Sequence, residues 1–475
     1  MVFNSAVFFL FFLIVLLLYW KFFTKNLLAR NLFIIAASLF FYGWWDWRFI
    51  FLWMFTSLTD FFIAIQIAKH RNKGKILLLF SICINLAVLG FFKYFNFFVN
   101  SFSVLLNHFG LKASVTTLQV VLPIGISFYT FQAMSYTIDV YRKKIKPCKD
   151  LSKYLAFISF FPQLVAGPIE RSQHMLPQFN TLKRITGDDI KIGLQLILWG
   201  LFKKTVIADN LAIYVDEVFN HTANYSGLSC IVAALFFTVQ IYCDFSGYTD
   251  IARGTARLLG FDLMQNFSLP YFATSFTDFW KRWHISLSSW FRDYVYIPLG
   301  GNRQGKVREI INLNLTFILS GLWHGANFTF LIWGALHGLY NSIEKIVVEK
   351  GMFKLPRAIK HILVFLLVAF AWIFFRAATL HDATLFIRQL FHTTSTGSFI
   401  VNFVQAYKHT GYGLWFLLPL CIFIWLECIS CVKNSSGVFF ISHRLSRVTI
   451  YYALFLSILL FGVFNNAPNF IYFQF

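Results

Sequence analysis

Apolar stretches long enough to cross a bilayer recur along almost the whole chain, and this feature limits the possible folds most. A spanning helix needs about 20 mainly apolar residues. The candidate spans are residues 5–22, 31–45, 48–68, 76–99, 120–141, 190–210, 227–250, 309–322, 325–343, 358–376, 412–432 and 448–465. The stretches 309–322 and 325–343 are short and meet at a polar break, so they form either two spans or one bent element.

The overall composition agrees with a membrane location. Of 475 residues, 58% are hydrophobic and only 13% are charged, whereas a soluble domain carries about a quarter charged residues. The 62 Phe and 14 Trp residues fit a lipid-facing exterior with aromatic belts at both interfaces. The sequence therefore predicts an all-α, polytopic membrane protein with about 10–12 spanning helices, and it excludes a soluble fold.

The basic residues indicate an orientation. The net charge of +21 suggests a nucleic-acid partner at first, but the cations lie in short clusters between apolar spans, as the positive-inside bias produces. The clusters lie at 21–30, 69–75, 142–149 and 433–447. They share one side of the membrane if both termini are external, with residues 466–475 as an external tail. We expect no nucleic-acid partner, and we interpret residues 1–20 as a retained first span.

Two segments do not resemble ordinary spans. Residues 151–180 and 262–308 mix aromatic residues with Pro, Gly, Asp, Arg and His. Such backbone lies at membrane depth only where protein shields it or where it lines a wet cavity. We therefore expect re-entrant or cytoplasmic-face segments here. Because the chain shows neither an internal repeat nor a low-complexity linker, we expect a single membrane domain over residues 1–475.

Two histidines are candidates for catalysis. His324 lies at a polar break between apolar stretches, with Trp323 and Asn327 beside it. A buried imidazole stays neutral and suits a general base toward a hydroxyl, although it could also be a structural His bonded to a carbonyl. His284 could orient a substrate or support His324. Alternatively, its segment, which continues to Arg292 and Asp293, is an interfacial helix with Trp and Arg anchors.

Polar residues also close the apolar span that ends near residue 250. Asp244, Ser246 and Tyr248 are costly at that depth unless they are paired. They could bind substrate, or they could join helices through hydrogen bonds. Arg253 and Arg257 follow at helical spacing, so a structural ion-pair network is the alternative.

Four basic residues could contact the phosphates of a cytosolic donor. Arg303 and Lys306 lie in a Gly-rich stretch that lacks the ending and the preceding strand of a phosphate-binding loop, so a cytoplasmic turn is the alternative. Lys203 and Lys204 interrupt an apolar helix, where they could contact phosphates or extend toward the interface.

The aromatic C-terminus carries the last candidate. Residues 470–475 could be an interfacial anchor. The phenol of Tyr472 could instead enter from outside and act as an acyl relay, as covalent catalysis with Tyr allows. We expect no metal site, because Cys428 and Cys431 have neither a second cysteine pair nor a nearby His.

Several motifs together resemble the membrane-bound O-acyltransferase (MBOAT) family, and within it the bacterial alginate O-acetyltransferase branch. The matching pieces are Arg30–Leu32, Phe40–Trp45, Phe160–Gln163, Ala166–Arg171, Tyr242–Ala252, Phe279–Leu287, Tyr296–Arg303, Ser320–Gly325 and Phe470–Phe475. They follow the family order across nearly the whole chain, and the ordered set is highly specific.

The resemblance implies roles for the candidate residues. It implies a ring of spanning helices around a central tunnel, with His324 as the catalytic histidine and His284 as the second functional histidine. It implies that Tyr472 lies in a motif used as an acyl acceptor. The residues implied to line or support the tunnel are Trp323, Asn327, Asp244, Ser246, Tyr248, Arg292, Asp293, Pro168 and Arg171.

The resemblance also implies an activity. A bacterial inner-membrane enzyme of this kind takes an acetyl group from acetyl-CoA, as a co-substrate with no bound cofactor, or from an acyl carrier. A periplasmic esterase-like partner then sets the group on an exported or cell-wall polysaccharide. Transfer of D-alanine to teichoic acid and acylation of a membrane lipid remain open. A transporter or flippase without chemistry should show inverted repeats with broken helices, which the sequence lacks.

Overall fold

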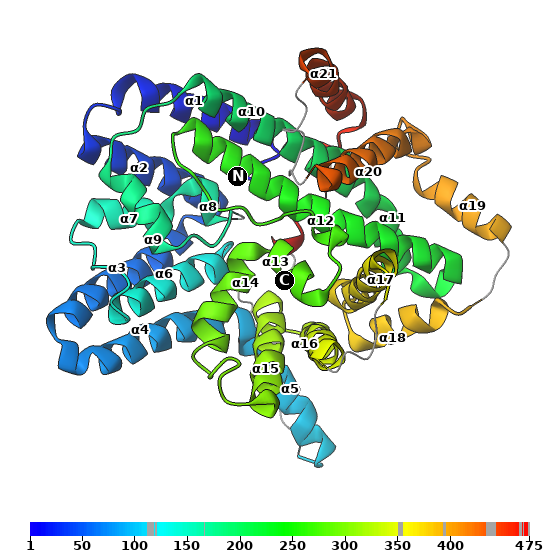
Figure 1. Ribbon diagram of the computed structural model, residues 1–475, viewed down its shortest axis with the longest axis horizontal. Coiled ribbons are helices and arrows are strands. Elements are labelled where there is room, and N and C mark those ends of the chain that lie inside the picture. The colour runs from blue at the N-terminus through cyan, green and yellow to red at the C-terminus, as the bar shows by residue number, and fades with distance from the viewer. Residues whose placement is uncertain are drawn as a thin grey trace. The chain divides into compact units, whose positions relative to one another are not determined.

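The computed structural model describes residues 1–111, 118, 121–165, 167–349, 355–392, 396–433, 443–464, 468 and 470–473 (Figure 1). Within these residues every regular element is helical, so the all-α expectation is confirmed. Contacts divide the chain into an N-terminal unit, Met1–Leu194 with Ala252–Met264, and a C-terminal unit, Gln195–Ile251 with Gln265–Phe475. The expectation of one domain stays a prediction.

Six helical stretches of the described chain are long and apolar enough to cross a membrane. They are α2 (Leu27–Asp46), α3 (Arg48–Lys69), the stretch from η1 to α5 (Arg71–His108), α12 (Gly227–Leu258), α17 (Arg357–Arg376) and the stretch from η8 to α20 (Gly413–Val432). Shorter apolar helices are α1 (Ala6–Phe22) and Leu445–Phe461 of α21. The expected multi-pass membrane protein is therefore confirmed.

One further candidate span, residues 120–141, contains the shorter helix α6 (Ile126–Tyr141). Residues 190–210 are helical throughout, since α10 (Gly187–Leu201) continues through the π-helical segment η4 (Phe202–Ala208) into α11 (Asp209–Asn220). π-helical turns are rare in proteins overall, but they occur often at functional sites. At η4, local contacts therefore favour a departure from regular α-helix geometry.

The doubtful pair of apolar stretches forms two separate helices. α15 (Lys306–His324) and α16 (Phe328–Glu349) lie side by side in the C-terminal unit (Figure 1). Glycine lets them approach closely, since a Cβ at Gly334 would lie 2.4 Å from the carbonyl oxygen of Phe317. A Cβ at Gly325 would lie 2.0 Å from the Phe330 ring. The break between the helices therefore places His324 as the last residue of α15.

Buried polar contacts join α3, α4 (Gly74–Leu89) and α6, which pack together in the N-terminal unit (Figure 1). Asp60 of α3 is fully buried and accepts hydrogen bonds from the hydroxyl of Ser81 at 2.6 Å and the amide of Asn85 at 2.8 Å. A carboxylate in an apolar helix is costly unless it is satisfied in this way. Here it is a structural contact between helices.

The segment 151–180 consists of short helices. They are α7 (Leu151–Ser159), α8 (Phe161–Leu164), α9 (Ser172–Met175) and η3 (Leu176–Asn180). Arg30 of α2 is fully buried, and its guanidinium donates to the carbonyl oxygens of Phe179 and Thr181. The charge of Arg30 is therefore used to fix this segment inside the N-terminal unit, not to mark a membrane face.

Residues 265–305 also form short elements, now in the C-terminal unit. They are η6 (Pro270–Phe272), α13 (Phe276–Arg282), α14 (Ile285–Phe291) and η7 (Arg292–Tyr296). The side chain of Ser275 caps α13 by accepting from the backbone N–H of Asp278 at 2.9 Å, which satisfies an otherwise unpaired donor of the first turn. His284 lies between α13 and α14, and its backbone belongs to neither helix.

Candidate active site

Three side chains predicted from the sequence meet in the C-terminal unit. His284 lies between α13 and α14, His324 ends α15, and Tyr472 lies in η10 (Ile471–Phe473). Their ring centroids form a triangle with sides of 6.3 Å between the two imidazoles, 5.5 Å from His324 to the phenol and 6.0 Å from His284 to the phenol. Two potential proton carriers and a potential nucleophile therefore share one site.

The backbone of His284 is unusual. Its φ of 42° and ψ of 54° lie in the left-handed region, which is uncommon for a residue other than glycine and often marks a functional position. Asn266 stabilises this turn through two hydrogen bonds. Its carbonyl oxygen accepts from the N–H of Ile285 at 3.0 Å, and its side-chain oxygen accepts from the N–H of Ser286 at 3.2 Å. Burial lowers the pKa of His284 to about 3, so the imidazole is neutral at physiological pH.

The surroundings of His324 are aromatic. Its side chain is buried, and the ring lies 5.0 Å from Trp323, 5.0 Å from Trp333 and 5.3 Å from Phe375, measured between ring centroids. Such a pocket has a low effective dielectric, in which charges and dipoles interact more strongly than in water. A proton transfer at His324 would therefore take place largely shielded from solvent.

Tyr472 lies deep in the same pocket. Its ring centroid is 4.4 Å from that of Phe245, and its hydroxyl oxygen is buried. Burial, with a smaller contribution from the Asp244 carboxylate, raises the pKa of this phenol well above its usual value. A phenol that holds its proton is a weak nucleophile until a base removes that proton, and His324 is the nearer of the two imidazoles.

The polar end of α12 holds the C-terminal segment from the other side. Asp244 accepts the backbone N–H of Ile471 at 2.8 Å, and the ring of Tyr248 stacks on Phe470 with centroids 4.2 Å apart. Ser246 instead accepts from the Lys203 ammonium at 2.9 Å. Two of the three residues expected to bind substrate therefore contact the C-terminus of the chain itself.

A cavity of about 340 Å³ lies between α13–η7 and the α15–α16 pair. It is lined by apolar rings and hydroxyls, with cations among them; the lining that concerns the site includes Lys281, Ser288, Ser289, Arg292, Ser320 and Lys345. Ser320 lies one helical turn before His324 on α15. Arg292 pairs with Asp293 at 2.8 Å. The cavity therefore has cations in its lining and reaches Ser320, one turn from His324.

The basic residues proposed for phosphate contact differ in placement. Arg303 and Lys306 are exposed at the turn before α15. Lys203 and Lys204 are buried in η4, where Lys203 pairs with Asp250 at 2.7 Å and Lys204 has carboxylate partners of its own. Carboxylates therefore balance both buried ammonium groups, and their contact with donor phosphates stays a prediction.

Two neighbours of His324 have structural contacts. The indole of Trp323 is buried. Asn327 accepts the N–H of Thr329 at 3.1 Å, as a cap of α16, and donates to the carbonyl oxygen of Ala378 at 2.6 Å. These contacts fix the turn that follows His324, which is the contribution of Asn327 to the site.

Pro168 and Arg171 belong to the N-terminal unit, where Pro168 is buried and Arg171 precedes α9. Their expected part in the tunnel stays a prediction. Ala166, Gln474 and Phe475, which belong to the motifs that suggested the family, lie outside the described residues.

The side chain of His174, three residues after Arg171, lies between two carboxylates. His174 contacts Glu170 at 2.8 Å and Asp262 at 3.6 Å, and these two carboxylates, Asp262 first, raise its pKa to about 10.

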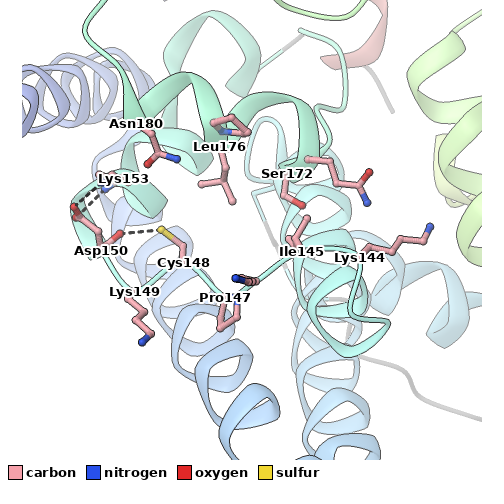
Figure 2. A pocket seen from close by; sticks show the side chains of 13 residues that line it. Lys144, Ile145, Pro147, Cys148, Lys149, Asp150, Lys153, Ser172, Leu176 and Asn180 are labelled. Carbon is pink, nitrogen blue, oxygen red and sulfur yellow. Dashed lines mark hydrogen bonds and ion pairs between the residues drawn. The ribbon is translucent and has the colours of Figure 1, made fainter.

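A second cavity, of about 570 Å³, lies within the N-terminal unit. It is lined by the basic cluster after α6 and by residues of α9 and η3, including Lys144, Lys146, Lys149, Lys153, Ser172 and Asn180. Figure 2 shows Asp150 at its edge, next to Lys153 and Cys148. Three of the lysines counted for orientation, Lys144, Lys146 and Lys149, therefore line one cavity.

Sequence reasoning missed the aromatic walls of the active site. Phe245, Trp333 and Phe375 contact the histidines or Tyr472, but nothing distinguishes them among so many aromatic residues. Ser320 was missed as well, although its place one turn before His324 was a usable signal. Among the described residues, no group of three or more His, Cys, Asp or Glu side chains could hold a metal ion.

Comparison with known proteins gives consistent matches. Residues 148–380 match the model of the membrane-bound O-acyltransferase family, MBOAT. The probable alginate O-acetylase AlgI of Pseudomonas putida is 43% identical over 389 residues, 81% of this chain and 79% of that protein. The peptidoglycan O-acetyltransferase of Helicobacter pylori is 33% identical over 523 residues, 100% of this chain and 98% of that protein.

A third relative matches a smaller part. The teichoic acid D-alanyltransferase of Bacillus subtilis is 30% identical over 235 residues, 47% of this chain and 60% of that protein. The family match contains both His284 and His324, and the extent of the first two matches confirms the resemblance found in the motifs. The chain belongs to the membrane-bound O-acyltransferase family, in the branch of the bacterial alginate O-acetyltransferases, and it is an O-acyltransferase.

Proposed function

We propose that the enzyme moves an acetyl group from cytosolic acetyl-CoA across the bacterial inner membrane, for O-acetylation of an exported or cell-wall polysaccharide. The observation that carries this proposal is the phenol of Tyr472 beside two imidazoles, 5.5 Å from His324 and 6.0 Å from His284 between ring centroids. The relatives named alginate O-acetylase and peptidoglycan O-acetyltransferase support a polysaccharide as the final acceptor.

In the first step, the phenolic oxygen of Tyr472 attacks the carbonyl carbon of the acetyl thioester. His324 takes the phenolic proton as the new C–O bond forms. The C–S bond breaks, and the leaving thiolate receives the proton from the imidazolium. The products are acetyl-Tyr472 and the free thiol of coenzyme A, and His324 is neutral again.

His284 acts on the charge that develops on the carbonyl oxygen. Its imidazole is buried and neutral, so one ring nitrogen carries a hydrogen and can donate to an oxyanion. The fixed left-handed turn between α13 and α14 keeps this donor in place. A pre-positioned donor in a dry pocket stabilises the transition state without reorganisation.

In the second step, an acceptor hydroxyl attacks the carbonyl carbon of acetyl-Tyr472. The phenolate leaves and takes up the proton, which regenerates Tyr472. The acceptor belongs to a periplasmic esterase-like partner or to the polysaccharide itself, and it approaches from the outer side, where both termini lie in this proposal. A phenyl ester is an activated acyl donor, so no further energy source is needed.

The donor enters through the cavity of about 340 Å³ beside α15. Hydroxyls along its wall suit the amides of a pantetheine arm, and the ammonium of Lys281 suits its phosphates. The cavity reaches Ser320, one turn from His324. A thioester at the end of such an arm therefore arrives beside the catalytic imidazole.

A matched pair of histidine variants tests the proposal. His324 and His337 are both buried, and each has its ring 5.0 Å from that of Trp333. Membranes are incubated with labelled acetyl-CoA and acceptor. We expect His324→Gln to reduce transfer by about 10²–10⁴-fold, the usual value of general-base assistance, and His337→Gln to keep it within a few-fold. Full activity of a well-expressed His324→Gln enzyme would contradict the role.

Transfer of D-alanine from a carrier protein to teichoic acid is the second candidate, and the relative from Bacillus subtilis supports it. That match covers 47% of this chain, against 81% and 100% for the two acetyl-transferring relatives. Supplying the same membranes with D-alanyl carrier protein separates the two. Our proposal expects label from acetyl-CoA alone.

A further inference from the structure

A buried ionic cluster lies directly behind the C-terminal tail segment, which we define as Pro468 with Phe470–Phe473. Lys204 of η4 forms ion pairs of 2.7 Å with Asp209 and with Asp244. The three residues are 1%, 1% and 3% exposed. Burying charges costs several kcal/mol per ion, so such a pair is weak evidence of a stabilising role. The contacts of the cluster indicate a geometric role instead.

Both members of the central pair bind the main chain of the tail segment. Asp244 uses one carboxylate oxygen for Lys204 and the other for the N–H of Ile471, at 2.8 Å. The Lys204 ammonium also lies 3.4 Å from the carbonyl oxygen of Pro468. A hydrogen bond to a charged group is roughly twice as strong as one between neutral groups. The ion pair thus holds the segment at two points.

The neighbouring chain is fixed to the same helix. The carbonyl oxygen of Thr205, next to Lys204 in η4, accepts from the N–H of Val463 at 3.1 Å. Two successive lysines of the π-helical η4, Lys203 and Lys204, are both buried and pair with carboxylates of α12.

We infer that Lys204 and Asp244 are positioning residues, which hold the tail segment so that the Tyr472 ring lies between His284 and His324. The ionic pair fixes Ile471, the residue directly before Tyr472. The described ring contacts of Tyr472 include Phe245 and His324 in the aromatic pocket. The effect of this positioning on acetyl transfer rests on the proposed function, whereas the placement of the tail segment does not.

The adjacent lysine provides a matched control. Lys203 pairs with Asp250 at 2.7 Å, the same distance as between Lys204 and Asp244, and both pairs join η4 to α12. The hydrogen-bond partners described for Lys203, Ser246 and Asp250, are on α12. Asp250→Asn therefore removes a nearby charge, on a side chain 15% exposed against 4% for Asp244, without removing a described contact of the tail.

The experiment measures amide hydrogen exchange of the C-terminal peptide in the full-length enzyme in nanodiscs. We expect Asp244→Asn to speed exchange of the tail by about 10–100-fold, the loss of one charge-assisted hydrogen bond, and Asp250→Asn to leave it unchanged. Equal exchange in wild type and Asp244→Asn, or an equal increase in both variants, would overturn the inference.

A second variant avoids disturbing the buried charges. Ile471→Pro removes the donated N–H and keeps Lys204, Asp209 and Asp244 intact. We expect faster exchange of the remaining tail amides, together with a fall in kcat for acetyl transfer of about 10–100-fold and a donor KM within twofold of wild type. Unchanged exchange in this variant would also overturn the inference.

The two proposals can fail separately. If Tyr472→Phe keeps full acetyl transfer, the relay is wrong, yet the exchange difference between Asp244→Asn and Asp250→Asn still measures the positioning role. If Tyr472→Phe abolishes transfer while Asp244→Asn leaves both exchange and kcat unchanged, the relay stands and the positioning role is wrong.

Discussion

The aromatic pocket and the ionic cluster lie on two sides of the same tail segment, and they differ in almost every physical property. On one side, the planar rings of His284, His324 and Phe245 surround the Tyr472 ring. On the other, Lys204 and Asp244 hold the main chain with full charges. The pocket contacts the reacting side chain, and the cluster contacts the backbone.

This difference separates positioning from chemistry. Charged hydrogen bonds restrict the backbone strongly, but a full charge next to a general base would shift its proton affinity. The ions lie behind the backbone and the rings lie around the phenol, which gives a fixed nucleophile in a pocket of low dielectric. The Asp244 carboxylate also acts on the phenol, since its charge adds to the raised pKa of Tyr472. The comparison makes predictions that differ for the two sides, from large effects to small ones.

The largest effect should come from Tyr472→Phe, which removes one oxygen from the aromatic side and leaves the ionic side intact. We expect acetylation of the final acceptor to fall by about 10³-fold, while the exchange rate of the tail amides stays that of wild type. Acceptor acetylation is measured with labelled acetyl-CoA. Undiminished acetylation would leave Tyr472 as a packing residue only.

A smaller effect should follow from blocking the approach to the pocket. Ser320→Phe places a ring in the cavity of about 340 Å³, one turn from His324. We expect kcat/KM for acetyl-CoA to fall by about 30-fold, mainly through KM. Steady-state kinetics on purified enzyme measure this. If kcat falls and KM does not, the donor reaches His324 by another route.

Loosening the packing on the aromatic side should reduce kcat less. Phe245 contacts both His284 and Tyr472, with ring centroids 4.6 Å and 4.4 Å away. Phe245→Leu keeps the apolar character and removes the flat wall. We expect kcat to fall by about fivefold, with tail exchange unchanged. A faster tail exchange would show that the rings, as well as the ions, hold the segment.

The smallest effect concerns a second cation between two carboxylates, His174 with Glu170 and Asp262. Its pKa, raised from 6.5 to about 10, means that the stabilisation is complete below pH 6.5 and is lost as the pH rises through 10. His174 is 37% exposed, so solvent screens the effect.

We therefore expect the melting temperature of wild type to drop by about 2 °C more than that of His174→Gln between pH 6 and pH 10. Differential scanning fluorimetry in detergent measures both proteins. Parallel curves would mean that His174 carries no charge-dependent stabilisation.

The sequence indicated much of this architecture. Apolar length predicted the spans of α2, α3, α12 and α17, because a helix in lipid must satisfy its own backbone over a set thickness. The polar break predicted the end of α15 at His324. The ordered motifs predicted His284 and Tyr472 as well, and the structure brings all three together.

Other features depend on contacts far apart in the chain, which no local pattern carries. Arg30 looked like a flanking charge, but it is buried against η3 about 150 residues later. For Lys204, phosphate contact and extension toward the interface were both open, and its partner Asp244, which lies 40 residues further along the chain, was not foreseen. The sign of a charge is visible in a sequence, but its depth and its partner are not.

Acetylation of Tyr472 itself tests the central claim most directly. Wild-type enzyme is mixed with isotope-labelled acetyl-CoA in the absence of acceptor, quenched and digested, and its C-terminal peptide is analysed by mass spectrometry. The account predicts a labelled acetyl ester on Tyr472 that is absent from His324→Gln and disappears when acceptor is added. An enzyme that acetylates its acceptor while Tyr472 never carries the label would contradict it.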